Sequence, residues 1–145
     1  MFDIFVERVI DKDINYLFDL FANVEGYSSF RGVQSAELLE PGESEKYGLG
    51  ALRCIHLGAM KIEERITCFE KPYRLDYLIE NSSPLPFKHE LGSIRLQEDK
   101  GKTKVTWISK GTIDIPILGA LVLDRIFERK GNQSFGSLLK QASLR

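Results

Sequence analysis

The chain of 145 residues is poor in the residue types that build disulfide and metal sites. It has two cysteines and two histidines, and Cys54 and Cys68 lie neither in a CxxC motif nor beside a histidine cluster. Cysteines in this pattern make neither a disulfide framework nor a metal site. We therefore predict free thiols, no metal ion and no cofactor.

An excess of charge of either sign is also missing. Lysine and arginine number 20 against 21 aspartate and glutamate, so the chain has no overall positive field to hold nucleic acid. No run of about 18 apolar residues is present to cross a membrane, and the N-terminal residues mix charged with apolar side chains, unlike a signal peptide. We expect a cytoplasmic protein without stable membrane insertion and without a nucleic-acid partner.

Familiar catalytic motifs are absent too. The serines form no GxSxG elbow, and the glycines of residues 48–53, "GLGALR", precede strand-like residues, whereas a phosphate-binding loop opens a helix. His56 and His89 have no evident partner that would orient a base or share a metal ion, so we expect both at the surface. These absences favour a binding protein over an enzyme.

The N-terminal part predicts a strand followed by two short helices. Residues 2–10 are rich in β-branched and aromatic side chains, which is typical of a strand. Residues 11–30 place acidic residues before apolar ones at helical spacing, with an aspartate as N-cap. Gly26 should break this helix, "VEGYSSF" predicts a second short helical turn, and residues 33–40 predict the next strand.

The rest of the chain divides at Pro116. Up to Ile113 the pattern is that of strands, and after Pro116 the apolar period becomes about 3.6, which predicts one long helix over residues 117–144. One stripe of this helix comprises Ala120, Leu123, Phe127, Gly131, Ser134, Phe135, Leu138 and Ala142. Because glycine costs about 0.5–1 kcal/mol relative to alanine within a helix, we expect a bend or a close approach at Gly131.

The hairpin around residues 58–59 carries the most specific prediction. If these two residues form the turn, the register sets Arg53 opposite Glu64. Side chains alternate, so both charges lie on an apolar face that also carries Ala51, Ile55, Leu57, Met60, Ile62 and Ile66. Buried ion pairs add little net stability, which leaves two interpretations open. The pair is either a polar clamp for a ligand in an apolar cavity or a structural ion pair near the sheet edge.

The same register argument extends to the later strands. Across the next turn it sets Leu75 opposite Cys68 and Tyr77 opposite Ile66, so Tyr77 joins the apolar face. Trp107 joins it from the last strand. The two aromatic side chains either stack on a ligand or donate hydrogen bonds to it, or they are simply part of the core.

Together these elements predict an α+β protein with a single domain over residues 1–145. A curved antiparallel sheet of six to seven strands should wrap around the long C-terminal helix, with two short helices after the first strand. Backbone cannot fill all the space that such a sheet encloses, so we expect a mostly apolar cavity of roughly 300–1,000 Å³. The candidate ligand-binding residues are Arg53, Glu64, Tyr77, Trp107, Ile55, Ile62, Ile66 and Phe127.

Several segments resemble the polyketide cyclase/dehydrase family of the START-like superfamily, also called SRPBCC or helix-grip, which has the fold of the birch pollen allergen. The likeness lies in residues 13–30, 48–53, 63–79 and 101–111 and in the long terminal helix. It covers nearly the whole chain, and it implies the curved sheet and terminal helix described above.

The resemblance also implies a function. An apolar cavity between sheet and long helix is common to the superfamily, which implies that this chain binds or carries a small hydrophobic ligand, such as a lipid, a quinone or a polyketide-like compound, as a monomer or homodimer. One alternative is a cyclase or dehydratase in which Glu64 or Tyr77 moves a proton. The other is a module that contacts membrane lipids or a protein partner.

Overall fold

The computed structural model describes residues 1–116 and 119–145. Seven strands form one antiparallel sheet in the order β1-β7-β6-β5-β4-β3-β2. The strands are β1 (Phe2–Ile10), β2 (Ser35–Glu40), β3 (Leu52–Leu57), β4 (Met60–Glu70), β5 (Arg74–Ser83), β6 (Phe87–Asp99) and β7 (Lys102–Ile113). The helical elements are α1 (Ile14–Ala22), the 3₁₀-helix η1 (Val24–Ser29), the π-helical segment η2 (Gly119–Leu123) and α2 (Asp124–Ser143).

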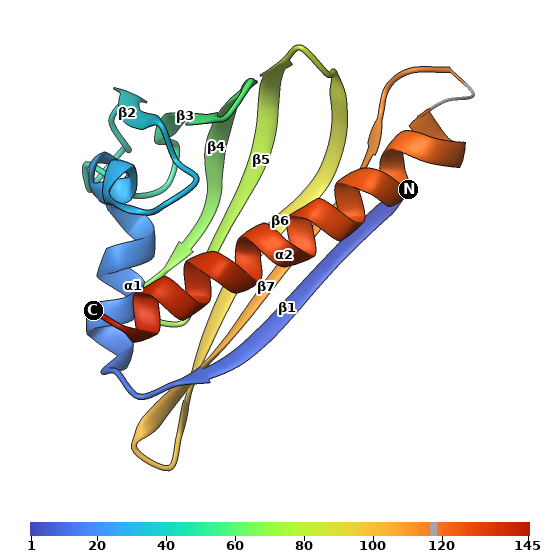
Figure 1. The fold of residues 1–145 in the computed structure, drawn as a ribbon. Helices are drawn as coiled ribbons and strands as arrows, with labels where there is room; N and C mark the ends of the chain where they lie inside the picture. The colour runs from blue at the N-terminus through green and yellow to red at the C-terminus, as the bar shows by residue number, and fades with distance from the viewer. Residues whose placement is uncertain (117–118) are drawn as a thin grey trace.

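The sheet curves around the C-terminal helix. Figure 1 shows α2 crossing in front of the strands and running beside β1, with α1 and η1 near the C-terminal end of α2. This arrangement confirms the predicted α+β architecture, with seven strands and two short helices after the first strand. Among the described residues, no helix combines the length and the apolar character needed to span a membrane.

The first helix begins as predicted but ends earlier. Asp13 is the N-cap, and its carboxylate accepts hydrogen bonds from the backbone N–H groups of Asn15 and Tyr16 at 3.0 and 3.3 Å. The helix ends at Ala22, because the chain turns into η1 at that point, and Gly26 lies inside η1 rather than at the helix end. The expectation that Gly26 breaks the first helix was therefore wrong.

The terminal helix approaches β1 closely at its buried glycine. A methyl group added to Gly131 would overlap Cδ1 of Ile4, so the close approach expected there is confirmed. The buried side chains of this helix differ from the predicted stripe, since Ser134 is exposed, whereas Leu139 and Asp124, which lie outside the stripe, are buried. The Asp124 carboxylate accepts a hydrogen bond of 2.8 Å from the backbone N–H of Ile113, which joins the start of α2 to the end of β7.

The predicted helix over residues 117–144 begins in a different form. Residues 117–118 lie outside the described residues, as does the side chain of Ala120. The described part starts with π-helical η2 and becomes α-helical only at Asp124. The long terminal helix is thus confirmed over α2.

The predicted strand registers hold except at one bulge. Arg53 pairs with Glu64, and Tyr77 lies opposite Ile66. Leu75, however, lies opposite Phe69 rather than Cys68, because a register shift between Ile66 and Cys68 adds one residue to β4. A side-chain pattern of period two carries no sign of such an extra residue.

Candidate ligand-binding site

A cavity of about 90 Å³ lies between the sheet and α2. Its walls are mostly apolar, as predicted, but its volume is below the predicted range. Aromatic side chains occupy the missing space, because the rings of Trp107 and Phe135 stack with centroids 4.0 Å apart. The rings of Phe87 and Phe127 pack nearby with centroids 4.9 Å apart. The predicted volume was therefore wrong because side chains fill what the backbone leaves open.

Arg53 and Glu64 form a buried ion pair in the wall of this cavity. Their exposed fractions are 2% and 3%. Arg53 donates from Nε to Glu64 Oε1 at 2.9 Å, donates from Nη2 to the same oxygen, and donates from Nη1 to the carbonyl oxygen of Phe21 at 3.1 Å. Its guanidinium carbon also lies 5.1 Å from the ring centre of Tyr27. The predicted pairing on the apolar face is confirmed. The arginine contacts the Glu64 carboxylate, the Phe21 carbonyl oxygen and the Tyr27 ring.

The cavity wall also offers one hydrogen-bond acceptor and one donor that remain unused. Among the hydrogen bonds of residues 1–116 and 119–145, none involves Glu64 Oε2. Trp107 Nε1 donates to the Tyr77 hydroxyl at 2.9 Å, and in the described part of the chain that hydroxyl donates to no acceptor. Burial, with Glu64 nearby, raises the pKa of Tyr77 above its ordinary value, so the hydroxyl keeps its proton at neutral pH.

His89 is half-buried rather than exposed at the surface, so the sequence-based expectation for it was wrong. It lies within β6, its Nδ1 accepts a hydrogen bond of 3.0 Å from the Ile79 N–H, and its Nε2 lies 2.9 Å from Ser109 Oγ. Its ring stacks on Tyr77 with centroids 5.7 Å apart. Because burial lowers the pKa of His89 to about 4, the ring is neutral at pH 7, and an accepting Nδ1 leaves the proton on Nε2, which donates to Ser109.

A signal for His89 was present in the sequence. In "FKHEL", the charged residues Lys88 and Glu90 alternate with the others, as in a strand with one exposed face. A strand over these residues sets His89 on the opposite face from Lys88 and Glu90, and β6 includes all three.

Most of the predicted site residues lie together. Seven of them line the cavity: Arg53, Glu64, Tyr77, Trp107, Ile55, Ile62 and Phe127. Ile66 is buried in the adjoining core and does not line it. Sequence reasoning missed Tyr27 and Val33, which come from η1 and the segment after it, where no periodic pattern marks an inward face.

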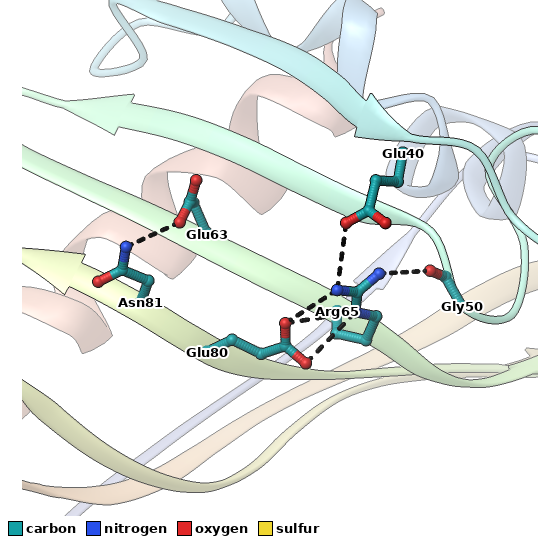
Figure 2. Close-up of polar contacts among 6 residues, drawn as sticks. All are labelled: Glu40, Gly50, Glu63, Arg65, Glu80 and Asn81. Atoms are coloured by element: carbon teal, nitrogen blue, oxygen red, sulfur yellow. Dashed lines mark hydrogen bonds and ion pairs between the residues drawn. The ribbon is translucent and has the colours of Figure 1, made fainter.

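The outer face of the same strands carries a second set of charges. Figure 2 shows Arg65 between Glu80 and Glu40, with its guanidinium also donating to the Gly50 carbonyl oxygen at 3.0 Å. The shortest distances from Arg65 to the Glu80 and Glu40 carboxylates are 3.1 and 3.3 Å. The Glu80 side chain is 46% exposed, so this cluster faces solvent.

Metal ligands do not gather anywhere in the part of the chain that the structure describes. No group of three or more His, Cys, Asp or Glu side chains there is placed to hold a metal ion.

Comparison with known proteins identifies the fold. No protein-family profile matches the chain, and no curated protein matches its sequence. A START superfamily protein from Mycobacterium smegmatis has a structure that covers 97% of this chain and 94% of its own, with a TM-score of 0.77 and 7% sequence identity. The chain has the START-like, helix-grip fold.

Two further structures share the START-like fold. A major latex-like protein from Panax ginseng has a TM-score of 0.64 at 12% identity, covering 94% of this chain and 95% of its own. The Aha1 dimer from Colwellia psychrerythraea has a TM-score of 0.69 at 10% identity, covering 99% and 94%. At these identities the likeness shows the fold alone, and the narrower placement in the polyketide cyclase/dehydrase family stays a prediction.

Proposed function

We propose that the chain binds a small apolar molecule whose polar group is held by Glu64 and Tyr77. One observation carries the proposal: the cavity is mostly apolar, its polar lining includes a buried arginine–glutamate pair and the hydroxyls of Tyr77, Tyr27 and Ser109, and the pair leaves one carboxylate oxygen unused. A few placed polar groups in an apolar pocket are what orient a small ligand. Because a buried ion pair adds little net stability, ligand recognition supplies a reason for its presence.

The ligand must displace side chains to enter. The cavity is smaller than the roughly 150 Å³ of an engineered cavity that takes benzene. Phe127, Phe135 and Leu138 of α2 line it and are only half-buried, so they are the side chains with room to move outward. We therefore expect ligand binding to enlarge the cavity at its α2 wall.

A binder or carrier fits this site better than a cyclase or dehydratase. Histidine is the side chain whose ordinary pKa suits proton transfer near pH 7, yet burial keeps His89 neutral and both ring nitrogens are in hydrogen bonds. The proposal includes a single ligand-binding domain over residues 1–145, located in the cytoplasm. In this proposal the protein acts as a monomer or homodimer, binds no nucleic acid and does not insert into a membrane.

Titration calorimetry with decanol tests the proposal. Leu138→Trp should fill the cavity and weaken decanol binding at least about tenfold relative to the unmodified chain. Ile126→Trp is the matched control, because Ile126 lies on the same helix and is 47% exposed. Failure of the unmodified chain to bind decanol, or equal loss in both variants, would refute the proposal. Native mass spectrometry of the purified protein provides a second readout through any retained apolar ligand.

A further inference from the structure

A cationic groove, lined by Arg8, Arg31 and Lys140, lies outside the cavity where α2 passes the end of β1. It encloses about 740 Å³, and asparagine, glutamine and serine side chains fill the rest of its polar lining. No aspartate or glutamate of the described residues lines it. In a chain whose net charge is −1, three cations gathered without an acid form a local positive field.

The groove exists because a row of helix side chains is interrupted. Glu128 and Asn132, one turn apart on α2, accept hydrogen bonds from the backbone N–H groups of Asp3 and Phe5 at 3.0 and 3.1 Å, which covers the open edge of β1. The next position in this row is Gly136, which has no side chain to continue the cover. A methyl group there would lie 3.5 Å from a guanidinium nitrogen of Arg8, so the row opens beside that arginine.

The three cations have no carboxylate partner among the ion pairs of residues 1–116 and 119–145. Arg8 donates from Nη1 to the backbone carbonyl of Glu7 at 2.7 Å. Arg31 is held by its backbone, because Gln141 Oε1 accepts from the Arg31 N–H at 2.8 Å, and its guanidinium has no hydrogen-bond partner in the described structure. The groove therefore presents charge that the protein does not neutralise.

A third hollow adjoins both this groove and the cavity. It has a volume of about 370 Å³ and shares Arg31 with the cationic groove. At its other end it shares Val33, Leu57 and Leu138 with the cavity. Leu57 and Arg53 are four residues apart on β3, which corresponds to about 13 Å along an extended strand. The cationic groove, this hollow and the cavity with its inner polar groups thus adjoin one another in that order.

We infer that the ligand is an elongated amphiphile with an acidic head group at one end and a hydroxyl or carbonyl group at the other. The carboxylate or phosphate head binds the cationic groove, where arginine forms strong charge-assisted hydrogen bonds. The apolar chain runs along the adjoining hollow, and the distal polar group meets Tyr77 and Glu64. This inference rests on the proposed function, because it extends the ligand of the same cavity outward.

Two small-molecule probes with alkyl chains of the same length test which head group the groove binds. Omega-hydroxydecanoate carries an acid and a hydroxyl, and decanediol carries a hydroxyl at both ends, so the pair differs only in the charge of one end. By titration calorimetry the acid should bind about tenfold more tightly, and added salt should reduce this advantage. Arg31→Gln and Lys140→Gln should each reduce it, whereas Lys130→Gln, an exposed cation of α2 that does not line the groove, should leave it unchanged.

The outcomes separate the two claims. Equal binding of the two probes, or an acid advantage that survives Arg31→Gln together with Lys140→Gln, overturns the acidic head group and leaves the cavity as a binding site. Failure of both probes to bind overturns the proposed function as well. Inorganic phosphate that competes with omega-hydroxydecanoate but not with decanediol supports the groove as the site of the head group.

Discussion

Glu64 and Arg65 are neighbours in β4, and each belongs to an ion pair on an opposite face of the sheet. The inner pair, Arg53 with Glu64, is almost completely buried and makes further contacts with Phe21 and Tyr27. The outer pair, Arg65 with Glu80, faces solvent (Figure 2). The same two kinds of charged group, on the same strand, therefore have very different environments.

The difference shows where a functional interpretation is needed. In water the attraction between Arg65 and Glu80 adds little stability, and their charges lose little hydration. A solvated sheet surface is therefore enough to explain this outer pair. The inner pair has lost its hydration and returns little net stability, so a sheet alone does not explain it. The unused carboxylate oxygen and the cavity beside it supply the explanation proposed above.

Removing one member of the inner pair should have the largest effect on stability. Arg53→Met or Glu64→Leu leaves an uncompensated buried charge and should lower the free energy of unfolding by about 3–5 kcal/mol. The double variant should lose much less, or even gain, because no charge is stranded. Urea unfolding of the two single variants and the double variant forms a double-mutant cycle. Additive, near-zero effects would mean that the pair is exposed.

His89 and His56 lie on opposite faces of the sheet and should differ in how they make stability depend on pH. A folded-state pKa of about 4 for His89, below the ordinary 6.5, means that the unfolded chain binds the proton first as pH falls. The contribution of His89 to the free energy of unfolding is fully present above pH 6.5. It is lost as the pH falls from 6.5 to about 4, and the loss amounts to about 2–3 kcal/mol.

Thermal unfolding across this pH range checks the histidine prediction. His89→Asn should flatten the dependence of stability on pH, because asparagine offers an acceptor to the Ile79 N–H without titrating. His56→Asn, which changes the histidine opposite Lys61 on the outer face, is the control. Equal slopes for the unmodified chain and His89→Asn would contradict the half-buried, neutral state of His89.

The two glycines of α2 provide a third contrast. Gly131→Ala should destabilise the fold by about 1–3 kcal/mol, because the added methyl group forces Ile4 to move within a packed core. In Gly136→Ala the added methyl group would lie at an ordinary contact distance, 3.5 Å, from a guanidinium nitrogen of Arg8. This change should stabilise the fold by about 0.5–1 kcal/mol through higher helix propensity. The sign of the difference, measured by urea unfolding, decides whether α2 packs too closely on β1 for a side chain at Gly131 but not at Gly136.

Breaking the outer pair should have the smallest effect. Arg65→Met should change the free energy of unfolding by about 0–1 kcal/mol, and the change should shrink with added salt. A cost close to that of Arg53→Met would show that the two faces are energetically alike, which would remove the reason for treating the inner pair as special.

The inner pair was predictable because a two-residue turn and the alternation of strand side chains fix which residues meet. The register at Leu75 was not, because the bulge after Ile66 adds a residue without changing the pattern. The cavity volume depends on how the Trp107 and Phe135 rings stack, which side-chain periodicity does not contain. The cationic groove needs β1, α2 and the segment after η1 to meet in space, so no local pattern predicts it.

Ligand uptake by the inner double variant tests the central claim most directly. Arg53→Met with Glu64→Leu should keep the fold, because no charge is stranded, while it removes the acceptor, so decanediol binding by titration calorimetry should weaken at least about tenfold. The outer double variant, Arg65→Met with Glu80→Leu, should bind decanediol like the unmodified chain. Unchanged decanediol binding in the inner double variant would contradict the account and leave Arg53 and Glu64 as a purely structural pair.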